Sequence, residues 1–184
     1  MPFIKTDIPE LIIFKPVVFE DSRGSFFETY NQTVFANEGF NYDWVQDNQS
    51  TSKYGVVRGL HFQNPPHAQA KLVRVLSGKI WDVAVDIRKG SPNFGKYFGI
   101  ELSSENRLQL LIPEGFAHGF SVLSTEATVL YKCNKIYNKE SERGIIYNDP
   151  LLHIDWKLQP QEMILSEKDQ KNPLLSACNN LFEY

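Results

Sequence analysis

A series of short stretches rich in β-branched and aromatic residues runs from residue 11 to residue 136, and only brief turn sequences separate them. The turns include "SGK", "KGSPNFG", "SSEN" and "PEG". Short strands at this spacing are typical of an antiparallel sandwich or barrel. We expect strands within residues 11–19, 25–30, 44–51, 56–62, 70–76, 79–87, 96–102, 107–113, 118–124 and 127–136.

Helical signals are sparse. Residues 32–40, "QTVFANEGF", follow Asn31, a good N-cap residue, and contain Gly39, a common helix stop. The tail after Pro150 has a mixed pattern. We therefore predict an all-β, cupin-like jelly roll with a few short helices, forming a single domain over residues 1–184 without repeats or linkers.

Composition excludes several classes of function. The formal net charge of -3 gives no basic field for binding nucleic acid through its phosphates. No apolar stretch approaches the length of a membrane span, and the N-terminus lacks the pattern of a secretion signal. We expect a cytoplasmic protein without nucleic-acid or membrane partners. Cys133 and Cys178 are too few for a disulfide framework, so we expect reduced thiols.

Polar residues occur on strand faces that are otherwise apolar. Because side chains alternate along a strand, residues of equal parity share a face. Four such faces are Phe116, His118, Phe120 and Val122; Lys71, Val73 and Val75; Val129, Tyr131 and Cys133; and Trp44, Gln46, Asn48 and Ser50. Several strands thus direct one or two polar groups into an apolar interior, as expected for a ligand pocket in a barrel mouth.

Arg58 and His61 are three residues apart, so in a regular strand they would face opposite ways. Either only one of them reaches the interior, or Gly59 marks a β-bulge that redirects the chain. We predict the bulge, because bulges occur beside active sites and glycine tolerates their geometry.

Five residues, His61, Lys71, His118, Tyr131 and Asp169, have the chemistry for acid–base catalysis. An imidazole at His61 can accept a proton near neutral pH, and the Asp169 carboxylate can fix its tautomer. The Tyr131 phenol can return a proton from the other side, and Lys71 or a second histidine can stabilise an oxyanion. Such a set suits removal of a proton next to a carbonyl and its return to the opposite face.

Each residue also has a structural interpretation. His61 and His118 can be core histidines with satisfied nitrogens, and Tyr131 can be a core tyrosine with a bonded hydroxyl. Lys71 can be a surface lysine and Asp169 a cap or turn residue. "PEGFAH" matches the spacing of the second metal-binding motif of cupins, but "LHFQ" lacks the paired histidines and the glutamate of the first, so we expect no metal.

The chain resembles the dTDP-4-dehydrorhamnose 3,5-epimerase family along nearly its whole length. The matching stretches, in order, are "FEDSRGSFFETY", "VQDNQSTSKYGVVRGLHFQ", "QAKLVRVLSGKIWDVAVDIRKGSPNFGKY", "LLIPEGFAHGF", "LYKCN", "YNDP" and "LSEKD". The resemblance implies a cupin jelly roll, a homodimer, no metal and no organic cofactor. Its substrate would be a dTDP-linked 4-keto-6-deoxy sugar, inverted at C3 and C5.

The resemblance also implies roles for individual residues. His61 would be the base, Asp169 its partner, Tyr131 the acid and Lys71 the residue that stabilises the enolate at O4. The residues implied in substrate binding are Arg23, Glu28, Gln46, Asp47, Asn48, Arg58, His118, Glu142 and Lys168. Lys168 stands where the resemblance leads us to expect arginine in many members. A phosphate or sugar contact at this position would therefore either be altered or be made by the lysine ammonium.

Three alternatives stay open at this point. The first is an epimerase that acts at C3 or C5 alone, in a related dTDP-4-keto-deoxysugar pathway. The second is a metal-dependent cupin enzyme. The third is a module that binds sugar nucleotides without catalysis.

Overall fold

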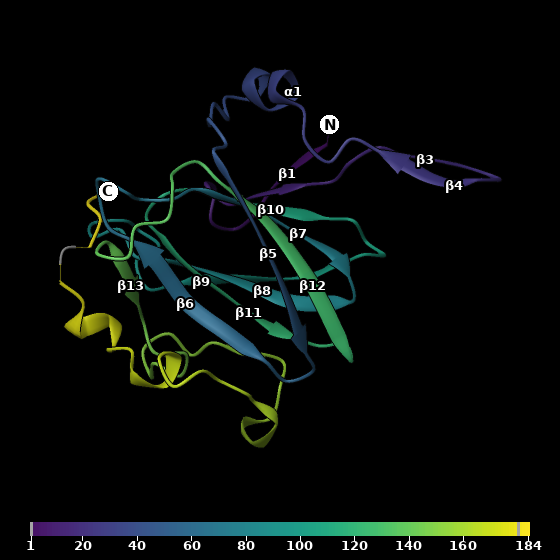
Figure 1. The fold of residues 1–184 in the computed structure, drawn as a ribbon. Coiled ribbons are helices and arrows are strands. Elements are labelled where there is room, and N and C mark those ends of the chain that lie inside the picture. Colours follow the sequence, from purple (N-terminus) through teal and green to yellow (C-terminus); the bar gives the residue numbers. More distant parts are fainter. Residues whose placement is uncertain (1, 180) are drawn as a thin grey trace.

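The computed structural model describes residues 2–179 and 181–184, and it is built mainly from two antiparallel sheets that face each other (Figure 1). The larger sheet has the strand order β1(Phe3–Lys5), β2(Ile12–Phe14), β10(Gln109–Ile112), β7(Lys71–Ser77), β12(Glu126–Cys133) and β5(Gln46–Lys53). The second has the order β13(Glu142–Gly144), β6(Val57–Gln63), β11(Phe116–Val122), β8(Lys79–Asp86) and β9(Tyr97–Ser103). The predicted antiparallel jelly roll is confirmed.

Most predicted segments contain one strand. The segment 11–19 is the exception, since Lys15, Pro16 and Val17 interrupt it between β2 and the next strand, β3(Val18–Asp21). Proline has no N–H to donate to a ladder, which accounts for the break. β1 and β13 were not predicted, because three residues are too few to reveal a period of two.

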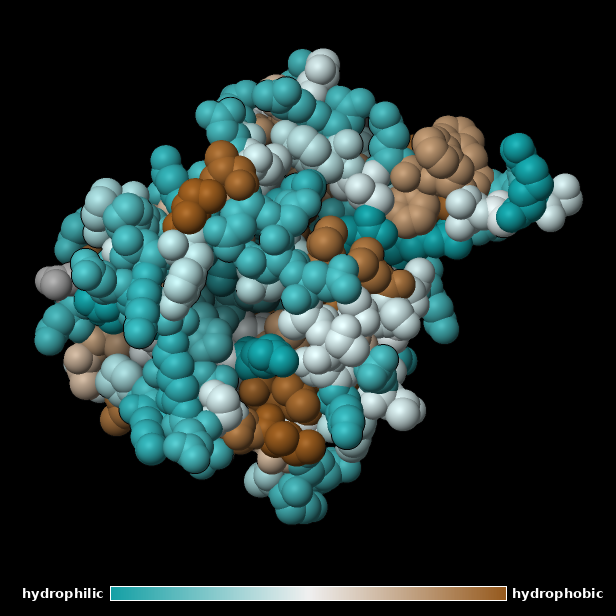
Figure 2. Space-filling model, in the orientation of Figure 1, coloured by the Kyte–Doolittle hydropathy of each residue, from teal (hydrophilic) through white to brown (hydrophobic). Residues whose placement is uncertain are grey.

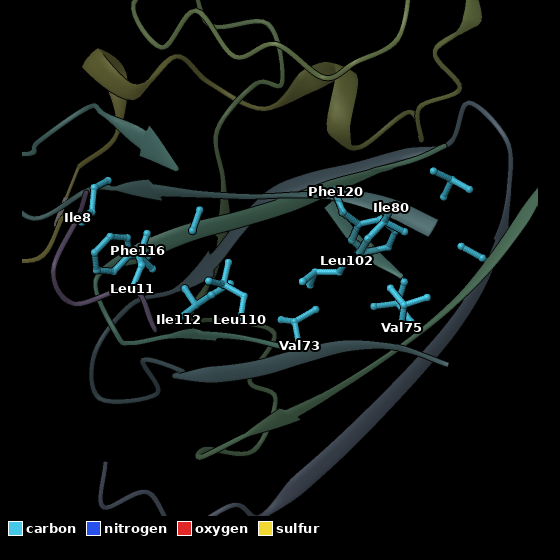
Figure 3. Packing of buried hydrophobic residues seen from close by; sticks show 14 residues of the cluster. Ile8, Leu11, Val73, Val75, Ile80, Leu102, Leu110, Ile112, Phe116 and Phe120 are labelled. Carbon is cyan, nitrogen blue, oxygen red and sulfur yellow. The ribbon is translucent and has the colours of Figure 1, made fainter. Parts of the chain in front are cut away.

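Apolar side chains from both sheets fill the space between them (Figure 3). Figure 3 shows Val73 and Val75 from β7 facing Ile80, Leu102 and Phe120 from the second sheet. Residues of β7, β8, β9, β10, β11 and β12 contribute to this core, and they alternate along the strands as parity predicts. Polar side chains on the same faces therefore also enter the space between the sheets.

The helical elements are short. Helix α1(Gln32–Asn37) begins after Asn31, whose side-chain oxygen accepts hydrogen bonds from the backbone N–H groups of Thr33 and Val34. Gly39 follows it with a φ of +89°, a conformation that glycine adopts without strain. Three 3₁₀ turns, η1(Pro160–Glu162), η2(Asp169–Lys171) and η3(Leu175–Ala177), lie in the C-terminal segment. Among the described residues, no helix has the length and apolarity needed to span a bilayer.

Strands β3 and β4(Gly24–Phe27) form a two-stranded hairpin that projects from the barrel (Figure 1). Two of its phenylalanines are unusually exposed, Phe19 by 63% and Phe26 by 69%, and so is Val17 just before the hairpin, by 64%. Figure 2 shows the hairpin at the right with a tan, apolar group beside hydrophilic residues. An isolated hairpin is at best marginally stable in water, so this one needs a surface to pack against.

Candidate active site

A cavity of about 370 Å³ opens between the two sheets. The residues around it come from both sheets, from the β6–β7 connection and from the segment that leads to β13, and Figure 2 shows the surface hollowed near the centre of this face. They are Gln46, Asn48, Ser50, Arg58, His61, Phe62, Gln63, Gln69, Lys71, His118, Gly119, Phe120, Tyr131, Tyr137 and Glu142. Many of the residues selected from the sequence are therefore brought together.

The bulge predicted at Gly59 is confirmed. His61 pairs with His118 and Arg58 with Phe120, so β6 spans the same length as β11 with one extra residue. Gly59 has a φ of +132°, and a Cβ there would lie 2.5 Å from the Cα of Gly119. Because of the extra residue, Arg58 and His61 both line the cavity.

His61 and Asp169 form a close pair, with 2.6 Å between His61 Nε2 and Asp169 Oδ1. Asp169 begins η2 and is buried. Among the described residues, His61 is the only ionisable side chain that forms a hydrogen bond with it. Burial raises the pKa of Asp169, but the hydrogen bond and charge of His61 outweigh burial and hold that pKa below its usual value. An ionised carboxylate here fixes the orientation and the tautomer of the imidazole.

Tyr131 lies across the cavity from His61, because Tyr131 belongs to β12 of the larger sheet and His61 to β6 of the second. Its hydroxyl makes no hydrogen bond to the described residues, and burial raises the pKa of its phenol. A phenol with a raised pKa keeps its proton at neutral pH. The side chain can thus donate a proton into the cavity from the face opposite the imidazole.

Lys71 is only 9% exposed and forms no ion pair within 4.0 Å with a described residue. Its ammonium lies 5.9 Å from the centre of the Tyr131 ring. Burial lowers the pKa of Lys71. A desolvated ammonium without an ion pair is suited to stabilise an oxyanion that forms in the cavity.

His118 is buried beside these groups, with 2.8 Å between its Nε2 and Oδ1 of Asp82. Burial lowers the pKa of His118, although Asp82 opposes that shift. The sequence reasoning missed Asp82. The alternation of side chains could have identified Asp82, because it has the same parity as Ile80 and Ala84 on the buried face of β8.

Glu142 lies at the cavity mouth and joins two neighbours. Its Oε2 lies 2.5 Å from Lys168 Nζ and accepts a hydrogen bond of 2.9 Å from the Tyr137 hydroxyl. Burial raises the pKa of Glu142, but the bonds from Lys168 and Tyr137 leave it below its usual value. Lys168 is thus one contact away from the cavity.

Gln46 and Asn48 line the cavity and are joined by a hydrogen bond of 3.0 Å from Gln46 Nε2 to Asn48 Oδ1. Asp47, between them on the edge strand β5, faces the other way and pairs with Lys132 at 3.1 Å. The structure therefore separates Asp47 from its two neighbours in the predicted set.

Arg23 and Glu28 also lie away from this cavity. Arg23 sits in the turn of the β3–β4 hairpin and pairs with Asp21 at 2.6 Å, and Glu28 is exposed after β4. The family resemblance implied both residues in substrate binding. Neither of them lines the cavity of its own chain.

Several cavity residues had not been selected, including Ser50, Gln63, Gln69 and Tyr137. Ser50 shares the parity of Gln46 and Asn48, so the sequence contained that signal. Tyr137 and Gln69 belong to connecting segments, for which periodicity gives no orientation. In the part of the chain that the structure describes, no three His, Cys, Asp or Glu side chains gather in a group that could hold a metal ion.

Comparison with known proteins shows which family the chain belongs to. The family model described as dTDP-4-dehydrorhamnose 3,5-epimerase matches residues 5–177. The enzyme of that name from Shigella flexneri is 55% identical over 170 residues, which cover 92% of this chain and 93% of the relative.

Two crystal structures of similar proteins show the same fold. A dTDP-4-dehydrorhamnose 3,5-epimerase from Elizabethkingia anophelis is 54% identical, with a TM-score of 0.91 over 95% of this chain and 96% of the other. A dTDP-6-deoxy-D-glucose-3,5-epimerase from Legionella pneumophila, in complex with dTDP-4-keto-L-rhamnose, is 48% identical, with a TM-score of 0.95 over 99% and 97%. The chain described here belongs to the dTDP-4-dehydrorhamnose 3,5-epimerase family.

Proposed function

We propose that this protein converts dTDP-4-dehydro-6-deoxy-D-glucose to dTDP-4-dehydro-L-rhamnose, with His61 as the base and Tyr131 as the acid. One observation supports the assignment most strongly. The imidazole, paired with Asp169, and the phenol enter one cavity from opposite sheets. Inversion at carbon needs a proton acceptor on one face and a proton donor on the other.

The reaction needs no redox step. The 4-keto group acidifies the C–H bonds at C3 and C5, and His61 takes the proton from one of these carbons. The C–H electron pair forms a carbon–carbon double bond to C4, and the carbonyl electrons move onto O4. Lys71 stabilises the resulting oxyanion. Tyr131 then protonates the same carbon on the opposite face, the C4 carbonyl re-forms, and the proton on His61 returns to the phenolate through solvent.

The same set of residues acts at both carbons. The two C–H bonds flank one carbonyl, so a rotation of the bound sugar presents each in turn to the base. Asp169 stabilises the imidazolium that forms in each step, because its carboxylate is buried and hydrogen-bonded to His61.

Binding of the nucleotide orients the sugar. Arg58 lines the cavity and its Nε donates to Ser52 Oγ at 3.1 Å, which leaves its terminal nitrogens for a phosphate. Gln46, Asn48 and Glu142 provide polar groups for the nucleoside or sugar. Contacts remote from the reacting carbon hold it in place for proton transfer.

We further infer that the active form is a homodimer in which the hairpin reaches the partner. Arg23 and Glu28, which the family resemblance assigns to the substrate, do not line the cavity of their own chain. The hairpin exposes Phe19 and Phe26, and β5 is an edge strand with one free side. Packing the hairpin on a second copy buries those phenylalanines and brings Arg23 to the other cavity.

Mixed dimers test this arrangement. Arg23→Ala and His61→Ala are each prepared alone, and the two inactive proteins are then mixed and allowed to exchange subunits. If Arg23 serves the partner's site, the mixed dimer contains one intact site out of two, and activity returns. If Arg23 serves its own site, every site lacks one residue and activity stays absent, which would refute the exchange.

The activity itself is tested with the 4-keto nucleotide sugar. We expect the purified protein to form the L-rhamnose precursor, identified by proton NMR coupling constants. His61→Ala should lose the reaction while still binding dTDP, since Arg58, Gln46 and Asn48 are unchanged. His153→Asn, at an exposed position in the C-terminal segment, is the matched control and should keep parental activity. An unchanged rate in His61→Ala would reject the proposed base.

A further inference from the structure

Asp82 is a buried carboxylate that the mechanism above does not use. It is 0% exposed, and only one of its oxygens has a hydrogen-bond partner, since Oδ1 lies 2.8 Å from His118 Nε2. The other oxygen, Oδ2, is buried without a partner among the described residues. A buried carboxylate that is half satisfied is costly unless a positive charge lies near it.

Asp82 faces the same interior as the catalytic groups. Its neighbours of equal parity on β8, Ile80 and Ala84, belong to the core between the sheets, and so do Val73 and Val75, which follow Lys71 on β7. The His118 ring, bonded to Asp82, lies 6.5 Å from the Tyr131 ring, and Lys71 Nζ lies 5.9 Å from that same ring. The His118–Asp82 pair and the Lys71 ammonium therefore lie beside the same tyrosine ring, between the two sheets.

The other titratable groups near Lys71 are either neutral or already paired. They are Tyr131 and Cys133 on β12, His118 on β11, His61 on β6 and Glu142 on β13. Burial raises the pKa of Tyr131 and of Cys133, and burial lowers the pKa of His118, so all three stay uncharged at neutral pH.

The remaining two have partners. His61 is bonded to Asp169, and Glu142 is paired with Lys168. Asp82 is thus the carboxylate near Lys71 that no lysine or arginine among the described residues contacts within 4.0 Å.

We propose that Asp82 is a positioning residue that acts as the counter-charge of the Lys71 ammonium and orients His118 for the substrate. This inference rests on the proposed function. Through Oδ1, Asp82 accepts the Nε2 proton of neutral His118, which leaves Nδ1 to accept a hydrogen bond from a sugar hydroxyl. Through its charge, Asp82 keeps Lys71 protonated while the oxyanion forms.

Asp82→Asn removes the negative charge and keeps the hydrogen bond, because the amide oxygen still accepts the proton of His118. The readout is the pH dependence of kcat, in which the alkaline limb reports loss of the Lys71 proton. We expect that limb to move to lower pH by about 1 unit or more when the counter-charge is removed. We also expect kcat to fall about tenfold or more at pH 8, with a smaller change in KM.

The control is Asp86→Asn on the same strand. Asp86 is equally buried, but it is bonded to Arg88 and Ser91 outside the cavity. This variant should lose stability and keep the parental alkaline limb. An unshifted limb in folded Asp82→Asn would overturn the proposal, while the parent's own turnover tests the proposed function separately.

If Asp82→Asn is recovered only unfolded, the double variant Lys71→Met/Asp82→Asn tests whether the two charges are paired. Removing both charges leaves neither one buried alone, so the double variant should fold and melt higher than either single variant. A double variant that stays unfolded, or that loses as much Tm as the two single variants together, would contradict the pairing.

Discussion

Replacement of Asp169 by asparagine should slow exchange at C3 and C5 by the same factor. The substitution keeps the size of the side chain and removes the charge that stabilises the His61 imidazolium. In the structure, His61 Nε2 and Asp169 Oδ1 are 2.6 Å apart, and Asp169 is buried. Since one base serves both carbons, a weaker base should affect both equally.

The size of the effect follows from this geometry. Two unit charges whose centres are about 4 Å apart attract by about 4 kcal/mol at an effective dielectric constant near 20. The His61 side chain is 33% exposed, so solvent screens part of that attraction, and we take about 2–3 kcal/mol as the loss. At about 1.4 kcal/mol per factor of ten, Asp169→Asn should reduce both rates by about 100-fold.

Proton NMR in deuterated water measures both rates in one experiment, as loss of the signals of the protons on C3 and C5 of the nucleotide sugar. Asp149→Asn is a matched control, because Asp149 is also buried but accepts hydrogen bonds from the backbone of Leu151 and Leu175, away from the cavity. It should exchange at the parental rate. Parental rates in Asp169→Asn, or slowing at one carbon alone, would refute the account of the pair.

Three further predictions concern the acid, the pH dependence and the bulge. Tyr131→Phe should reduce inversion by about 100-fold, most strongly at C5, while His61 still removes protons; a parental rate of product formation in a coupled assay would reject the phenol as the acid. Burial lowers the pKa of Lys71, so activity should fall as pH rises through that lowered pKa, before the ordinary value of about 10.4. Stability should rise over the same interval, because the unfolded chain still binds the proton there; a kcat profile and urea titrations across about pH 7–10 check both signs, and a kcat that stays level to the end of that range would contradict the first. Gly59→Ala should cost about 1–3 kcal/mol of unfolding free energy and lower kcat, since its Cβ would overlap Gly119 at a φ of +132°. Gly39→Ala, with open space around its Cβ, should cost only about 1 kcal/mol by comparison, and equal losses in a denaturant titration would argue against the bulge geometry.

Strand parity predicted much of the barrel and of the cavity. His118, Lys71 and Tyr131 each stand among apolar residues of equal parity, and each faces the space between the sheets. The same rule applied to "KIWDVAVDI" would have selected Asp82. The bulge at Gly59 also followed from the sequence, because Arg58 and His61 could reach one interior only if the strand gained a residue.

Other features depend on tertiary contacts that periodicity does not report. Asp169 comes 108 residues after His61, and only the fold brings η2 against β6. Tyr137 lines the cavity and Lys168 contacts it through Glu142, and both belong to segments without a regular period. The sequence position of Arg23 does not tell whether its side chain belongs to the cavity of its own subunit or to that of a partner subunit.

The most direct test of the central claim is solvent exchange by the unmodified protein acting on dTDP-4-dehydro-6-deoxy-D-glucose in deuterated water. The account predicts one solvent deuterium at C3 and one at C5 of the product, with both labels lost in His61→Ala. Label at a single carbon, or label at either carbon that survives in His61→Ala, would contradict one base acting twice across this cavity.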